Sequence, residues 1–339
     1  MKQIVLLIAT LAVFGCSSRQ SSSLLDLGEE IQITAEEYAN DLIIRNPLDI
    51  AVIEDEILLF MPQGENNAIL MINKENGILD GCWGKHGNGP GEFTYPIYWG
   101  HDTAKQELYL YDLNYRCLRT YAYQACDDSL SFDLTKEIKM QSDIAIRPGA
   151  ILGNHNIVAS AFMFHNAPLL LMDEDLKPLQ SFGRLPGQDE SFTDMRTYVG
   201  GVGSYENQFA FGMEDLGYLA FYTLSDTTVH KEWEIYLEKP IYREKELDGK
   251  KLKQGFKDIE MTKNYIFCGY CGKLFMRDNP EFMTNNILVF NYEGQLVRNL
   301  KLDRKIGHIA VSEDEKTIYA VAFEPNISIV RYSLDNLLH

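Results

Sequence analysis

One short pattern recurs six times along the chain at intervals of 43 to 58 residues, and it limits the fold more than any other feature. Each copy is a polar or small residue that leads into a short apolar strand. A period of this length in a β-rich chain is typical of propeller blades. The six copies are residues 49–52, 100–102, 143–146, 200–202, 258–261 and 308–311.

Strand signals fill the intervals between these copies. Runs such as 57–60, 68–72 and 107–111 are rich in β-branched and aromatic residues, and turn sequences separate them. Each unit has room for the four strands of a blade. We therefore predict an all-β fold, a single six-bladed β-propeller with four-stranded antiparallel blades over residues 30–339. Residues 30–33 have no unit of their own, and we expect them to close the ring by pairing with the last blade.

The N-terminus has the layout of an export signal. Lys2 precedes an apolar run over residues 4–14, which at about eleven residues is too short to span a bilayer. Residues 13–16 resemble the lipobox of bacterial lipoproteins, in which the cysteine receives lipid. The resemblance implies a signal peptide over residues 1–15, lipid attachment at Cys16 and a flexible tether over residues 16–29. A signal peptide cut at another bond is the alternative.

The net charge of −18 limits the partners of the chain. A strongly acidic surface repels nucleic acid and anionic lipid head groups, and it attracts cations and basic partners. We therefore expect no nucleic-acid binding, and we expect contact with the membrane through the N-terminal lipid.

Residues 83–93, a weaker copy at 182–187, and the segments 265–272, 287–294 and 318–321 resemble one family of propellers. They are similar to the TolB-like six-bladed β-propeller lipoproteins of Bacteroidetes and, more distantly, to NHL repeats. The resemblance implies a propeller in the cell envelope, lipid-anchored to the outer membrane, and it implies no catalytic residues. No acidic residue follows Cys16 until Asp26, which favours a periplasm-facing protein.

Residues 84–91 contain four glycines. A glycine-rich loop can hold phosphate through its backbone N–H groups, but this one lacks the Lys-Ser/Thr end and the helix of a P-loop. We interpret it as a turn between blades in which glycine supplies positive φ angles.

Five cysteines remain after Cys16, an odd number in a compartment that oxidises thiols, and their pairing stays open. Cys268 and Cys271 have the C-x-x-C spacing of redox and zinc sites, but a second pair or a helix N-terminus is missing. Packing or an ordinary disulfide is the preferred interpretation. The five cysteines are Cys82, Cys117, Cys126, Cys268 and Cys271.

If the six repeated segments are the innermost strands, their first positions surround one mouth of the central channel. Carboxylates and imidazoles there could bind a divalent cation or serve as acid and base. Polar residues also begin inner strands simply because the channel is wet. The candidate residues are Asp49, His101, Asp143, Asp258 and His308.

A second candidate site is an aromatic rim that could stack on sugars or on apolar side chains. Ordinary packing between blades is the alternative in a chain with 19 tyrosines. The candidate residues are Tyr95, Tyr98, Trp99, Tyr198 and Tyr205.

The chain contains neither a Gly-x-Ser-x-Gly elbow nor a His-Glu-x-x-His pair, which disfavours serine hydrolases and helical zinc proteases. We expect a binding or scaffold module for a protein, a peptide or a glycan. The alternative is a metal-dependent hydrolase or lyase whose site is the acidic mouth of the channel.

Overall fold

The computed structural model describes residues 24–39, 42–61, 67–126, 129–141, 144–162, 167–185, 199–244, 246–248, 250–274 and 283–338. Residues 1–23, and with them Cys16, lie outside these ranges, as do Asp143 and Tyr198. Every regular element within the ranges is a β-strand, so none of them is a helix that could cross a membrane.

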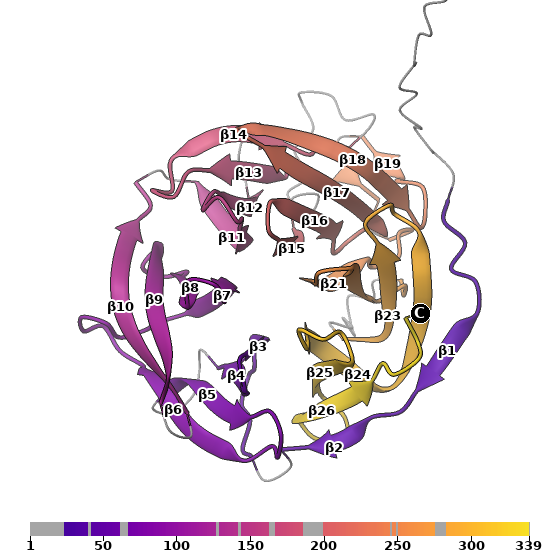
Figure 1. Cartoon of the computed structure of the whole chain (residues 1–339). Coiled ribbons are helices and arrows are strands. Elements are labelled where there is room, and N and C mark those ends of the chain that lie inside the picture. Colours follow the sequence, from indigo (N-terminus) through magenta and orange to yellow (C-terminus); the bar gives the residue numbers. More distant parts are fainter. Residues whose placement is uncertain are drawn as a thin grey trace, which may run out of the picture.

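Four antiparallel sheets form separate blades in a ring (Figure 1). Blade 1 contains β3 (Asp49–Ile53), β4 (Glu56–Phe60), β5 (Asn67–Asn73) and β6 (Leu79–Lys85). Blade 2 contains β7 (Pro96–Asp102), β8 (Glu107–Asp112), β9 (Cys117–Cys126) and β10 (Ser129–Lys139). Blade 3 contains β11 (Ala145–Ile151), β12 (Ile157–Phe162), β13 (Leu169–Met172) and β14 (Pro178–Phe182). Blade 4 contains β15 (Gly200–Tyr205), β16 (Gln208–Met213), β17 (Tyr218–Ser225) and β18 (Thr228–Tyr236).

The remaining eight-stranded sheet is two blades that share one long strand, β24 (Leu296–Val311). Its first half pairs mainly with β23 (Thr284–Asn291) and completes blade 5, which begins with β21 (Phe256–Met261) and β22 (Tyr265–Tyr270). Its second half, from Ile306 onward, pairs with β25 (Thr317–Ala322) and begins blade 6, which continues with β26 (Ser328–Ser333). The ring therefore has six blades, as the repeat predicts.

The N-terminal segment closes the ring, but with a different strand from the one we predict. β2 (Glu36–Tyr38) pairs antiparallel with β26 and completes blade 6. β1 (Glu30–Ile33) instead runs parallel to the outer half of β24 in blade 5. The prediction for residues 30–33 is therefore wrong, because Ile31 and Ile33 pack against the core between blades 5 and 6 and the chain needs three more residues to reach the edge of blade 6.

The residues before β1 also contact the propeller. Leu24 forms a β-bridge with Tyr236 of blade 4, and the Leu25 N–H donates to the Tyr236 carbonyl at 3.0 Å. The sequence places these residues in a flexible tether. The described chain thus contacts the outer edges of blades 4, 5 and 6 in turn before it enters blade 1.

The core is a ring of six apolar clusters, and each cluster fills the interface between two neighbouring blades. Successive side chains of a strand point to opposite faces of its sheet, so each blade packs one apolar face against the blade before it and the other against the blade after it. The clusters at the 6–1 and 1–2 interfaces, for example, share blade 1 through Ile57 and Leu58, which are consecutive residues of β4. This arrangement lets a long chain bury its apolar residues without one oversized core.

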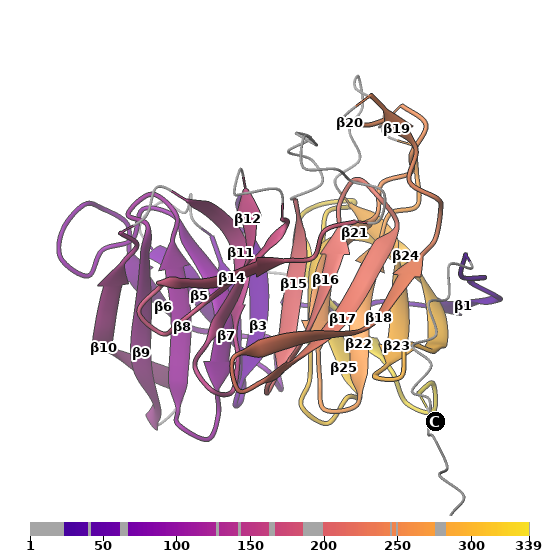
Figure 2. The ribbon, with the colours of Figure 1, turned by 90° about the horizontal axis from the view of Figure 1, so that it is seen from above.

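The ring has two different faces. On the loop face the chain passes from one blade to the next, for example through residues 86–95. On the hairpin face lie the turns between the first two strands of the blades, for example residues 103–106. A small hairpin of β19 (Tyr242–Arg243) and β20 (Glu246–Leu247) projects beyond the blades between blades 4 and 5 (Figure 2).

Candidate functional site

The innermost strands surround the axis of the ring (Figure 1). They line a cavity of about 760 Å³. It lies among β3, β7, β11, β15, β21 and the second half of β24, so every blade contributes to its wall. The repeat therefore leads to one shared site, because the repeated segments are innermost strands.

Four of the residues predicted for the channel mouth line this cavity, and three of them, Asp49, Asp258 and His308, lie at a similar level. They lie three or four residues before the ends of β3, β21 and β24, respectively. The equivalent positions of three blades thus bring two carboxylates and an imidazole together. Asp143 lies outside the described residues.

Asp258 connects two blades through backbone hydrogen bonds. Its Oδ1 accepts from the N–H of Ile259 at 3.0 Å, and its Oδ2 accepts from the N–H of Ile309 in blade 6 at 2.8 Å. The Nδ1 of His308 lies 3.9 Å from the same Oδ2. The carboxylate is therefore held in a fixed orientation at the edge of the cavity.

Glu260 also lines the cavity, and the sequence reasoning missed it. It stands two residues after Asp258 in β21, and side chains at this spacing lie on the same side of a strand. The alternation of Asp258, Ile259 and Glu260 was the signal that could have found it. No ion pair links Glu260 or Asp49 to a lysine, arginine or histidine of the described chain, and Asp49 accepts a hydrogen bond from the N–H of Ile50 at 2.9 Å.

Burial raises the pKa values of these three carboxyls, and neighbouring charges raise those of Asp49 and Glu260 further. Burial and then the charge of Asp258 hold the pKa of Asp49 well above its usual range. Burial, followed by the charges of Asp258 and Asp49, does the same to the pKa of Glu260. Burial also raises the pKa of Asp258, although His308 and the two backbone donors oppose the shift. A cation placed among the three would favour their ionised forms.

His101 does not occupy the position that the repeat predicts. It lies one residue before the end of β7, and Tyr98, four residues before that end, stands at the level of Asp49. His101 also lines the cavity, but at a different level from Asp49, because a bulge interrupts the pairing between Tyr98 and Gly100, where Gly100 has a φ of 129°. In blade 4, Gly200 lies five residues before the end of β15, so Gly201, four residues before that end, is the closer equivalent of Asp49.

His101 nevertheless contacts this level of the cavity through Tyr98. The two side chains are joined by a hydrogen bond of 2.6 Å between the Tyr98 hydroxyl and Nδ1 of His101. Burial lowers the pKa of His101 to about 4 and raises that of Tyr98, so both groups of this pair are neutral near pH 7.

Of the residues predicted as an aromatic rim, Tyr98, Trp99 and Tyr205 border the central cavity, whereas Tyr95 does not. Trp99 is only 2% exposed and stacks on Tyr111, with ring centroids 4.3 Å apart, in the core between blades 2 and 3. Adjacent side chains of a strand point to opposite faces of the sheet, so Trp99 points toward blade 3 while its neighbour Tyr98 points toward blade 1 and packs on Phe60. Tyr205 ends β15 on the hairpin face, whereas Tyr95 lies between blades on the loop face. Tyr198 lies outside the described residues.

The glycine-rich loop is a turn, in agreement with our interpretation. Its interior holds the carboxylate of Glu92, which accepts from the N–H of Gly89 at 2.8 Å and from Nζ of Lys85 at 2.8 Å. A Cβ on Gly87 would lie 1.9 Å from this carboxylate. An acidic side chain therefore occupies the place that a phosphate would need.

The four cysteines whose side chains the structure describes are free thiols. Cys268 is buried in the core between blades 4 and 5, and the thiol of Cys271 lies 3.4 Å from Oε1 of Gln254. Cys117 is buried and Cys82 is exposed. Packing accounts for the C-x-x-C spacing. Across the described ranges, no three His, Cys, Asp or Glu side chains are grouped so that they could hold one metal ion.

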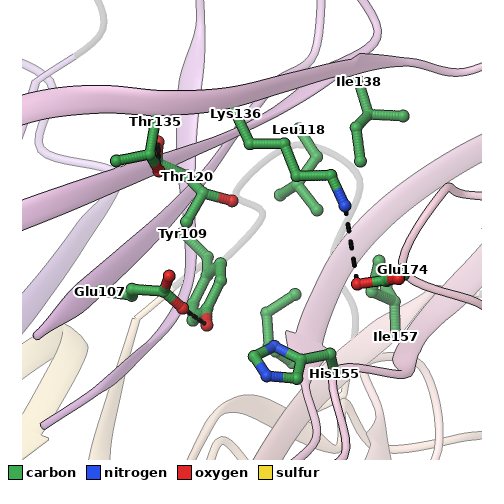
Figure 3. A pocket seen from close by; sticks show the side chains of 11 residues that line it. Glu107, Tyr109, Leu118, Thr120, Thr135, Lys136, Ile138, His155, Ile157 and Glu174 are labelled. Carbon is green, nitrogen blue, oxygen red and sulfur yellow. Dashed lines mark hydrogen bonds and ion pairs between the residues drawn. The ribbon is translucent and has the colours of Figure 1, made fainter. Parts of the chain in front are cut away.

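A second cavity of about 320 Å³ lies between blades 2 and 3 near the hairpin face (Figure 3). Its charged groups are paired: Nζ of Lys136 lies 3.6 Å from Glu174, and the hydroxyl of Tyr109 donates to Glu107 at 2.6 Å. His155, at the lower edge of the view, lies 2.5 Å from Nζ of Lys105. The central cavity is larger, and two of its carboxyls, Asp49 and Glu260, make no ion pair within the described chain, which makes it the stronger candidate.

A model of the family described as "TolB-like 6-blade propeller-like" matches residues 27–314. Among solved structures, a Bacteroides fragilis protein described as exported has 11% identity and a TM-score of 0.57, over 90% of this chain and 99% of that one. Chaetomium thermophilum Raptor has 11% identity and a TM-score of 0.50, over 89% of this chain and 29% of that one. These likenesses show a shared fold alone. In a search of curated proteins, none matches the chain.

Proposed function

The chain belongs to the TolB-like 6-blade propeller-like family, and from that premise we propose that it is a binding module of the cell envelope whose ligand occupies the central cavity. The ligand is a protein, a peptide or a glycan that inserts one group into the ring. Propellers place their shared site on the ring axis because every blade contributes an innermost strand to it.

The observation that carries this proposal is the central cavity itself. Its volume of about 760 Å³ is in the range of sites that hold a small molecule or one side group of a larger one. Asp49, Asp258 and Glu260 give its wall polar groups, while Val52 and Ile259 give apolar ones. A concave site in which polar groups stand beside apolar ones can bind and orient a ligand.

Two further features support the envelope location. The N-terminus has the layout of a lipoprotein signal that ends at Cys16, and a protein of similar fold from Bacteroides fragilis is described as exported. Anchoring to the outer membrane and a periplasm-facing propeller remain our prediction. The proposed anchor joins a segment that contacts the outer edge of the ring from Leu24 onward, which leaves the cavity open.

The test is a variant that obstructs the cavity. An added Cβ at Gly201 would make ordinary contacts with Ile259 at 3.5 Å and with the backbone of Asp258 at 3.9 Å, and the side chain of Gly201→Phe would then occupy part of the cavity. Thr228→Phe, on the exposed outer strand of blade 4, is the matched control. The protein carrying Cys16→Ser, to keep it soluble, is mixed with envelope extract and examined by native mass spectrometry. Wild type and Thr228→Phe should retain the same ligand, and Gly201→Phe should lose it. A ligand retained equally by all three proteins would contradict the proposal.

A further inference from the structure

We infer that the group held in the central cavity is an organic cation, an ammonium or guanidinium on an apolar stem. The inference rests on the proposed function, because it names the ligand chemistry of that same cavity. It follows from three properties of the wall: its charge, the state of its histidines, and its size and apolar part.

The wall carries an excess of negative charge. It contains eight acidic side chains and three lysines. Lys74 is already engaged, 3.2 Å from Asp55, and the charge of Lys257 acts on Glu214, where it opposes the rise in pKa that burial causes. Among the described residues, no ion pair joins Asp49 or Glu260 to a lysine. The eight acids are Asp49, Glu54, Asp102, Glu206, Glu214, Asp258, Glu260 and Glu313.

The histidines that face these carboxyls do not supply the missing charge. Nδ1 of His308 lies 3.9 Å from Asp258, but burial holds the pKa of His308 below its usual value. His101 is neutral, because burial lowers its pKa to about 4, and it shares a hydrogen bond with the hydroxyl of Tyr98. These histidines give Asp49 and Glu260 no positive charge, so a cationic ligand among the carboxyls would pair with their ionised forms and favour them.

The size of the cavity favours an organic cation over a bare metal ion. A volume of about 760 Å³ is far more than one ion fills. Val52, Ile97, Ile259 and Val311 line it between the polar groups, and an apolar stem can pack on them. The described residues also lack a group of three side chains that would share one metal ion.

Lysine side chains match this description, and three short peptides test it. Acetyl-Gly-Lys-Gly-amide carries an ammonium on an apolar stem, its norleucine analogue keeps most of the stem without the charge, and its glutamate analogue reverses the charge. Each is titrated calorimetrically at pH 7.5 and low salt into the chain carrying Cys16→Ser. We expect the lysine peptide to bind at least about tenfold more tightly than the norleucine peptide, and the glutamate peptide to give no heat of binding.

Variants locate the binding. Glu260→Gln keeps the shape of a side chain that makes no hydrogen bond within the described chain, and it should weaken the lysine peptide by about tenfold or more while it leaves the norleucine peptide unchanged. Glu174→Gln, at the second cavity, is the matched control and should change neither. Circular dichroism and thermal unfolding confirm that both variants are folded.

Four outcomes overturn the inference. They are equal binding of the lysine and norleucine peptides, a loss in Glu174→Gln in place of Glu260→Gln, stoichiometric binding of Ca²⁺ or Zn²⁺ that displaces the lysine peptide, and no binding of the lysine peptide. If the last occurs while Gly201→Phe still loses its envelope ligand, the charge assignment has failed and the proposed function stands. If the lysine peptide binds in the cavity but envelope ligands ignore Gly201→Phe, the proposed function has failed instead.

Discussion

Nδ1 of His308 in blade 6 lies 3.9 Å from Oδ2 of Asp258 in blade 5, so an imidazole and a carboxylate face each other where these two blades meet at the ring axis. The same oxygen accepts a hydrogen bond from the N–H of Ile309 at 2.8 Å. Burial keeps His308 neutral at neutral pH by lowering its pKa. The contact therefore fixes Asp258 in place but leaves its charge available to a ligand.

We predict that Asp112 is essential to the fold of blade 2. It is fully buried, accepts from the N–H of Thr94 at 2.8 Å and from the Thr94 hydroxyl at 2.6 Å, and lies 4.0 Å from the buried Arg119. Asp112→Ala would leave these donors unpaired and should lower the free energy of unfolding by about 3 to 5 kcal/mol. Urea unfolding measures this.

Asp55→Ala is the control for Asp112. Asp55 makes an ion pair of 3.2 Å with Lys74, but its side chain is 86% exposed, so its loss should change the free energy of unfolding by less than about 1 kcal/mol. Similar losses in the two variants would refute the role assigned to Asp112.

Glu56 should make the protein less stable as the pH rises. It is 4% exposed, its Oε2 has no hydrogen-bond partner in the described chain, and burial, followed by the charge of Asp80, raises its pKa to about 7. The folded state thus binds the proton more tightly than the unfolded state. The stabilisation is complete below the unfolded pKa of about 4.3 and is lost as the pH rises through 7. Glu56→Gln should therefore raise the free energy of unfolding at pH 8 by about 1 to 2 kcal/mol and change it less at pH 5.

The control for Glu56 is Glu75→Gln, which changes an exposed turn residue of the same blade. Urea unfolding of both variants at pH 5 and pH 8 checks the prediction. An equal effect of Glu56→Gln at the two pH values would show that the carboxyl does not titrate between them.

Two glycines of the turn between blades 1 and 2 should differ in cost. Gly84 has a φ of 76° and a Cβ there would lie 2.8 Å from the ring of Phe93, whereas Gly91 has a φ of 74° and nothing within 4 Å. Gly91→Ala carries only backbone strain, about 1 kcal/mol, while Gly84→Ala adds a clash and should cost about 3 kcal/mol. Thermal unfolding compares them, and equal melting temperatures would refute the packing against Phe93.

The sequence predicts the fold because the spacing of the repeat can be read along the chain without any knowledge of contacts between distant residues. Asp49, Asp258 and His308 were found because each begins one copy of the repeat, and each copy contributes the innermost strand of a blade. The level of His101 in the cavity was not predictable because the bulge before Gly100 depends on pairing with β8, which no local pattern records. Trp99 was assigned to a rim because its burial depends on Tyr111, twelve residues further along, and on blade 3.

Long-range pairing also explains the error at the N-terminus. Residues 30–33 alternate as a strand should, but which blade edge they join depends on distances across the ring. β2 is only three residues long and gives a weak signal in the sequence, although it completes blade 6. Glu260 was missed because its significance comes from Asp49 in another blade, which contributes to its raised pKa.

Lipid attachment at Cys16 is tested by cell fractionation. We expect the wild-type protein in the membrane fraction and Cys16→Ser in the soluble fraction, because a lipid chain supplies the hydrophobic anchor that an acidic propeller lacks. Protein bearing Cys16→Ser that stays with the membrane after a salt wash would show that another segment anchors it.

The central claim is that the cavity on the ring axis binds a cationic group among Asp49, Asp258 and Glu260. The most direct measurement is a crystal structure of the Cys16→Ser protein grown with acetyl-Gly-Lys-Gly-amide. We predict the lysine side chain in the channel, with its Nζ about 2.8 Å from at least one of the three carboxylates. A peptide bound only on the outer surface of the ring, with the channel holding solvent alone, would contradict the account.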